Sequence, residues 1–232
     1  MSTQKIEKKI DALKDKIEKF ISNDDGEMES IHKIRTSSRE VLSLLNEQKL
    51  HCVDLKKILK LSNKIRDIDV LLNEYFIRIP QNYHDQINIL FIKDILKEER
   101  NKELLVFLDY LRNFAIENIE FLQKEQNSNK ESQKPILSSN KKELHKYRIF
   151  IKNQLYIAKN CEPINKDKVI LLTKIKDLLG DINDNYNAIK IIKSINPNKK
   201  DIKELKRYTK EENLLNYKAV ESFILELEYK YI

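Results

Sequence analysis

The chain contains 232 residues, of which 41% are hydrophobic and 35% are charged, and its formal net charge is +7. This hydrophobic content excludes general disorder, and the positive charge favours an anionic partner without requiring one. With only 2 glycines and 4 prolines, the chain lacks the turn residues that an all-β protein needs, so we expect an all-α fold.

Apolar residues recur at helical spacing through the first part of the chain. They predict helices over about residues 4–22, 26–47 and 52–78, with Asp24 as the cap of the second. The third helix ends before Pro80, because the residue that precedes a proline avoids helical backbone angles. Residues 83–124 are periodic throughout and are consistent with one long helix, or with two that meet in the charged stretch 97–103.

A polar segment of low complexity, about 124–140, predicts a mobile loop in the second part of the chain. Helices are predicted after it over about 140–160 and 166–194. Asn196 followed by Pro197 is typical of a helix start, so we expect a last helix from there to the C-terminus.

One basic pattern occurs twice. A histidine is followed by an arginine three residues later and a second base seven residues later, first as His32, Arg35 and Arg39 and then as His145, Arg148 and Lys152. Each member of the second copy lies 113 positions after its counterpart. Another pair of blocks, 63–72 and 180–189, follows in the same order, and its Asp67 and Asp184 are 117 positions apart. The recurrence predicts one domain over 1–232 made of two related helical halves, about 1–97 and 98–232.

The spacing of the basic pattern places its three members on one face of a helix. In both copies this basic face runs along the edge of the predicted buried face, so the side-chain stems would pack while the charged heads stay free. Forked guanidinium groups suit the phosphates of an extended anion. A basic face on a single helix is more often merely solvated, and a lone histidine is more often structural than a ligand. The repetition favours a shared role.

At these residues the chain resembles the conserved histidine alpha-helical domain (CHAD) family. The family pattern is a helix that begins His-x-x-Arg with further bases, followed by a helix that ends Leu-Gly-x-x-Arg-Asp-x-Asp-Val. The first copy continues with Arg66, Asp67, Asp69 and Val70, and the second with Tyr156, Leu179, Gly180, Asn183 and Asp184. The resemblance covers essentially the whole chain. It implies two four-helix bundles related by a pseudo-two-fold axis, and non-catalytic binding of inorganic polyphosphate on a shared basic surface.

The chain also departs from the family pattern. Glu40, Leu42, Asn153 and Leu155 stand where family members usually carry arginines, and Asn63 stands where the first copy usually has glycine. We therefore expect fewer arginines to contact the anion than is usual in the family, and a larger share of the contacts to come from lysines.

The charge pattern and the resemblance together assign the expected site. The residues expected to bind polyphosphate are His32, Arg35, Arg39, Arg66, Lys141, Lys142, His145, Arg148 and Lys152. Additional candidates are Lys33, Lys56, Lys60, Lys64 and Lys146. Asp67 and Asp184 are expected to orient basic side chains of the facing helix.

No enzyme, metal or cofactor is expected. The sequence has no P-loop, nucleophile elbow or paired-cysteine motif. The four histidines, His32, His51, His84 and His145, lack the spacing of metal ligands. Glu226, Glu228 and Lys230 match the ExExK signature of triphosphate tunnel enzymes, but that signature belongs on a strand and here falls in a helical pattern.

Two other functions remain open at this stage: nucleic-acid binding through the same basic surface, and a helical scaffold for protein partners. The sequence shows no N-terminal hydrophobic leader and no apolar run long enough to span a bilayer. We therefore expect a cytoplasmic protein without a membrane partner, associated with polyphosphate granules if the resemblance holds, and with Cys52 and Cys161 reduced.

Overall fold

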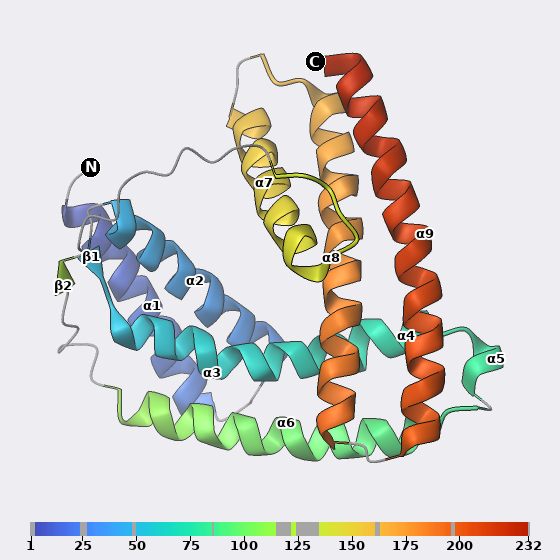
Figure 1. Ribbon diagram of the computed structural model, residues 1–232. Coiled ribbons are helices and arrows are strands. Elements are labelled where there is room, and N and C mark those ends of the chain that lie inside the picture. Colours follow the sequence, from blue (N-terminus) through green and yellow to red (C-terminus); the bar gives the residue numbers. More distant parts are fainter. Residues whose placement is uncertain are drawn as a thin grey trace. The chain divides into compact units, whose positions relative to one another are not determined.

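The computed structural model describes residues 3–23, 27–47, 50–84, 86–114, 122–123, 135–160, 163–195 and 198–231, and these form an all-α fold (Figure 1). The expected fold class is confirmed at this level. The long helices are α1 (Thr3–Asn23), α2 (Met28–Glu47), α3 (Val53–Val70), α6 (Ile89–Arg112), α7 (Lys141–Asn160), α8 (Lys166–Ile195) and α9 (Lys199–Tyr231). The short helices are α4 (Phe76–Arg78) and α5 (Gln81–His84), and the one antiparallel strand pair described is β1 (Leu50–His51) with β2 (Leu122–Gln123).

Most of the predicted helices agree with those of the structure to within a few residues. The exception is the helical stretch predicted over 83–124: α6 begins only at Ile89 and ends at Arg112, and Leu122–Gln123 is a strand, so this prediction is wrong at both ends. Two further refinements concern the third helix and the charged stretch of α6. The predicted third helix is α3 followed by a π-helix over Leu71–Tyr75 and then by α4, and Ile79 before Pro80 is extended. The charged stretch 97–103 does not break α6, which is continuous. The predicted cap at Asp24, most of the predicted loop 124–140 and the predicted cap at 196–197 lie outside the described residues.

The chain forms two compact units. Unit 1 combines Met1–Glu74 with Lys93–Ser128, and unit 2 combines Tyr75–Ile92 with Asn129–Ile232. These units interleave along the chain, whereas the expected halves meet near residue 97. The two related halves expected from the sequence stay a prediction.

Unit 1 buries one apolar face from each of α1, α2, α3 and α6. Its core includes Leu13, Ile34, Ile58 and the ring pair Phe20–Phe107, whose centroids are 5.9 Å apart. Cys52 is a buried free thiol at the start of α3, where its Sγ accepts a hydrogen bond from the backbone N–H of Leu55 at 3.4 Å. The sulfur thus fills the place of an N-cap side chain.

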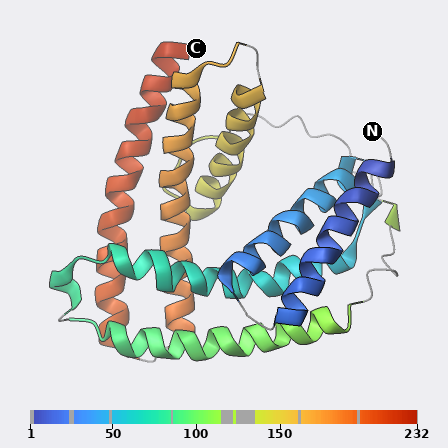
Figure 2. The same ribbon diagram turned by 180° about the vertical axis from the view of Figure 1, so that it is seen from behind.

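Unit 2 is built on α7, α8 and α9. The last two are antiparallel neighbours over much of their length in both views (Figures 1 and 2). Residues such as Leu144, Ile151, Leu172, Ile175 and Val220 interlock the three helices in one core. None of the helices in the described part of the chain has both the length and the apolar character that a membrane crossing requires.

Candidate functional site

The first basic stripe, which we define as His32, Arg35 and Arg39 on α2, does not present all three side chains to solvent. His32 and Arg39 are exposed, but Arg35 is only 6% exposed. The Nη1 of Arg35 donates hydrogen bonds to Oγ of Ser62 at 3.2 Å and to Oδ1 of Asn63 at 2.7 Å, both on α3. The expectation of a free charged head therefore does not describe Arg35, because α3 supplies acceptors that hold its guanidinium inside.

The electrostatics around Arg35 reflect both its burial and its neighbours. The pKa of Arg35 is lowered to about 10, chiefly by burial and also by the positive charges of Arg39 and Arg66, while the negative charge of Asp67 acts in the opposite direction. The side chain is nevertheless charged at neutral pH. Arg35 therefore lies close enough to two other guanidinium groups, those of Arg39 and Arg66, for their charges to act on it.

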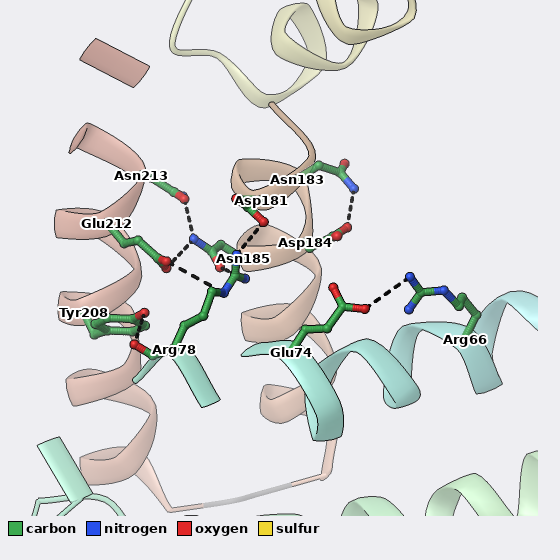
Figure 3. A network of polar contacts seen from close by, with 10 residues as sticks. All are labelled: Arg66, Glu74, Arg78, Asp181, Asn183, Asp184, Asn185, Tyr208, Glu212 and Asn213. Carbon is green, nitrogen blue, oxygen red and sulfur yellow. Dashed lines mark hydrogen bonds and ion pairs between the residues drawn. The ribbon is translucent and has the colours of Figure 1, made fainter. Parts of the chain in front are cut away.

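Arg66 and Asp67 are both half-buried on α3. Nη2 of Arg66 pairs with Oε1 of Glu74 at 3.5 Å (Figure 3), while its Nη1 is buried with no hydrogen-bond partner among the described residues. A guanidinium with one donor committed and another unsatisfied retains the capacity to bind an additional acceptor.

The second basic stripe, His145, Arg148 and Lys152 on α7, is more open. His145 and Lys152 are exposed and Arg148 is half-buried. Arg148 lies against Gly180 of α8: its Nη2 is 3.7 Å from the point where a Cβ on that glycine would sit. The Nε of Arg148 is buried and, within the described part of the chain, has no hydrogen-bond partner.

Polar side chains surround Arg148 in a small recess between α7 and α8, lined in part by Lys141, His145, Asn183 and Tyr186. The ammonium group of Lys141 lies 5.4 Å from the ring centroid of Tyr186 and donates to Oδ1 of Asn187 at 3.4 Å. Lys142 is exposed, and its backbone N–H is capped by Oδ1 of Asn140 at 2.9 Å. The recess thus carries several donors beside one half-buried guanidinium.

The expected orienting acids differ in what they contact. Asp67 acts electrostatically on Arg35. Asp184 is half-buried and accepts a hydrogen bond at 3.2 Å from Nδ2 of its neighbour Asn183 (Figure 3).

The two motif arginines meet the same position of the following helix. Arg35 donates to Asn63 of α3, and the guanidinium of Arg148 lies beside Gly180 of α8. Asn63 and Gly180 are themselves 117 positions apart, like Asp67 and Asp184. The contact is therefore repeated in each unit, with an amide acceptor in the first copy and no side chain in the second.

The additional lysines are all at the surface. Three of them form exposed ion pairs: Lys33 with Glu29 at 3.6 Å, Lys64 with Glu103 at 2.6 Å and Lys146 with Glu143 at 2.8 Å. Lys56 and Lys60 are exposed. Exposed pairs of this kind contribute only about 0–1 kcal/mol, so a stronger anion can displace the glutamates.

The predicted departures from the family pattern have structural counterparts. Glu40 is exposed and pairs with Lys9 at 2.8 Å, and this hydrogen bond lowers the pKa of its carboxyl. Asn153 is exposed, whereas Leu42 and Leu155 belong to the buried cores of their units. Arginines at the two leucine positions would have to displace core packing.

Sequence reasoning missed a polar network inside unit 2 (Figure 3). Arg78 of α4 donates to Oδ1 of Asp181 at 2.5 Å and to Oδ1 of Asn185 at 3.1 Å. The fully buried Asn185 in turn donates to Glu212 at 2.7 Å and to Asn213 at 2.8 Å, so the network joins α4, α8 and α9. The available signal was the spacing of Asp181 and Asn185, which are four residues apart and so share one face of α8.

Comparison with protein-family models, with curated proteins and with solved structures finds no match to this chain. Among the described residues, no cluster of three or more histidine, cysteine, aspartate or glutamate side chains is arranged to hold a metal ion. Glu226 and Lys230 of the ExExK match form an ion pair at 2.6 Å within α9.

Proposed function

We propose that this chain binds inorganic polyphosphate, or a similar linear polyanion, without chemical conversion, through the first and second basic stripes. The observation that carries the proposal is the repeated contact of a motif arginine with the following helix, Arg35 with Asn63 and Arg148 with Gly180. Burying part of a positively charged side chain beside other bases costs folding free energy. A bound anion would offset that cost.

The same contact supports the proposal that the chain is an internal duplication of a CHAD-like helical bundle, with the two bundles related by a pseudo-two-fold axis. In each copy the basic helix precedes the helix that it contacts, as α2 precedes α3 and α7 precedes α8. A solvated basic face has no reason to repeat a contact on its buried side.

The role of each residue in anion binding would depend on how exposed its side chain is. His32, Arg39, His145 and Lys152 are exposed and would contact phosphates directly. Arg148, which is half-buried, would present its guanidinium group at the edge of the recess. Arg35, which is buried, would contribute to the electrostatic field more than to contact. Many weak contacts along one chain of phosphates then add up through effective concentration.

The experiment is a competition assay. Labelled long-chain polyphosphate is bound to the protein and displaced by unlabelled polyphosphate, duplex DNA, single-stranded RNA or pyrophosphate at one salt concentration. We expect unlabelled polyphosphate to displace the label at the lowest phosphate concentration. Displacement by DNA or RNA at an equal or lower concentration would assign the surface to nucleic acid instead.

The assay is repeated with Arg39→Gln, Arg148→Gln and the double variant. Each single change should weaken binding roughly two- to fivefold, the scale of one exposed charge contact, and the two effects should combine as a sum of free energies. Lys19→Gln is the matched control, because Lys19 is an exposed base of α1 outside both stripes. A folded double variant that binds like the control would remove the stripes from the site.

A further inference from the structure

A groove in unit 2 has no role in the proposed function. It lies between α8 and α9 and is closed at one end by the start of α7, with a volume of about 360 Å³. Its walls are mainly apolar and include Leu144, Ile182, Ile189 and Leu214. The volume is within the roughly 300–1,000 Å³ of small-molecule sites.

The charged residues that line the groove, Lys206 and Lys210, both belong to α9 and lie one helical turn apart. The two helices run antiparallel (Figures 1 and 2), with Asn185 of α8 bonded to Asn213 of α9, and the groove is lined by Ile182, Tyr186 and Ile189 from α8 and by Lys206, Lys210 and Leu214 among others from α9. Lys206 also lines the groove and faces Lys193, and the nearby ammonium group of Lys193 lowers the pKa of Lys206. The mainly apolar groove therefore has two lysines in its lining, one of which lies beside Lys193.

The two lysines of the lining lack a counter-charge. No aspartate or glutamate lines the groove, and within the described part of the chain no ion pair of Lys206 or Lys210 is present. Ammonium groups that approach one another without a carboxylate repel, and an anion between them relieves that repulsion. The apolar wall and the two lysines point to two different parts of a single ligand.

We propose that this groove binds a single-chain amphiphilic anion, with its alkyl tail between α8 and α9 and its head group on Lys206 and Lys210. A fatty-acid carboxylate and an alkyl phosphate share this chemistry. Polyphosphate does not, because it has no apolar part to bury against Ile182 and Leu214. The inference therefore goes beyond the proposed function and stands or falls separately from it.

The length of the groove suggests the length of the tail. Along α9 the lining residues run from Lys206 to Tyr217, a rise of about 16 Å at about 1.5 Å per residue. An extended alkyl chain advances about 1.3 Å per carbon, because its bonds zigzag, so a tail of about twelve carbons together with its head group spans a similar length. Each buried methylene group contributes about 0.8 kcal/mol, so affinity should rise roughly tenfold for every two carbons until the groove is filled.

The test is titration calorimetry of the full chain with octanoate, dodecanoate and dodecyl phosphate, each below its micelle concentration. We expect saturable binding of one molecule per chain, with dodecanoate at least tenfold tighter than octanoate. Whichever of dodecanoate and dodecyl phosphate binds tighter identifies the head group. Dodecyltrimethylammonium has the same tail and a positive head, and equal binding of this cation would overturn the proposal.

Two variants and two controls locate the site. The double variant Lys206→Gln/Lys210→Gln should weaken dodecanoate binding at least fivefold, and Leu214→Ser should weaken it by a similar factor. The matched controls are Lys200→Gln and Leu225→Ser, exposed residues of α9 that do not line the groove. Circular dichroism checks that all four fold. If the groove variants bind like the controls, the proposal is wrong, whatever the outcome of the polyphosphate assays.

Discussion

Arg35 and Arg148 occupy the same place in the repeated pattern but differ in what surrounds them. The amide of Asn63 accepts from Arg35, whereas Gly180 offers Arg148 no side chain. The guanidinium of Arg35 is therefore held by an amide of the following helix, whereas the Nε of Arg148 has no hydrogen-bond partner among the described residues.

Gly180→Asn should give the arginine of the second copy the amide acceptor that the arginine of the first copy has. The added Cβ would meet Arg148 at ordinary van der Waals distance, 3.7 Å, so the variant should fold. Its amide would then accept from Arg148 and compete with a bound phosphate. We expect polyphosphate affinity to fall roughly two- to fivefold, the scale of a single charge contact, as measured by displacement of labelled polyphosphate.

Gly180→Ala is the control for that variant. It adds a Cβ without an acceptor, so it should leave affinity unchanged and raise the free energy of unfolding by roughly 0.5–1 kcal/mol, because alanine favours the helix interior. Equal losses of affinity in the alanine and asparagine variants would mean that the bulk of the added side chain, and not a hydrogen bond to it, limits phosphate binding by Arg148.

The buried Arg35 should contribute little net stability. Its pKa is lowered to about 10, so the folded state disfavours the charged form. At pH 7 the side chain is charged in both states and this cost is present in full; it would be relieved only as the pH rises above about 10. Arg35→Met keeps the packed stem without the charge and should leave the free energy of unfolding within about 1 kcal/mol of wild type.

Arg35→Ala provides the comparison, because it removes the stem as well and should cost roughly 2–3 kcal/mol through the cavity that it leaves. Urea unfolding at pH 7 measures both variants. A methionine variant as unstable as the alanine variant would show that the hydrogen bonds to Ser62 and Asn63 outweigh the cost of burial.

At the scale of elements, the helices themselves were predictable because long amphipathic periodicity leaves few alternatives. Pro80 marked the end of α4, since proline constrains the residue before it. The π-helix Leu71–Tyr75 was not predictable, because it keeps helical spacing in the sequence and differs only in how the backbone hydrogen bonds close.

The site was predictable as a helix face but not in its burial. Helical spacing places Arg35 near the boundary of the apolar face. Whether its side chain is buried or exposed depends on the packing of the facing helix. Arg78 was missed for a similar reason: its partners Asp181 and Asn185 are more than one hundred residues away in the sequence.

The Arg78 network should be a major source of specific packing in unit 2. Asn185→Ala would remove a buried amide that bonds to three other residues and leave their polar atoms unsatisfied. We expect the free energy of unfolding to fall by roughly 1–3 kcal/mol. Asn187→Ala on the same helix is the control and should change it by less than about 0.5 kcal/mol, since its one described bond is a long one to an exposed lysine. Similar values for the two variants would contradict this role.

At the scale of the whole molecule, the two basic stripes belong to different compact units and the net charge is +7. A long polyanion has enough phosphates to contact several bases at once, whereas a short one has few. Affinity should then depend on chain length, and it should fall with salt because bound phosphates release their counterions.

The measurement that tests the central claim most directly is the affinity of the wild-type chain for tripolyphosphate and for long-chain polyphosphate, at low and at moderate salt. The account predicts that the long chain binds much more tightly per molecule, and that its affinity falls more steeply with salt than that of tripolyphosphate. Equal affinity and equal salt dependence for the two would contradict it, because they would indicate a compact phosphate pocket and not an extended basic surface.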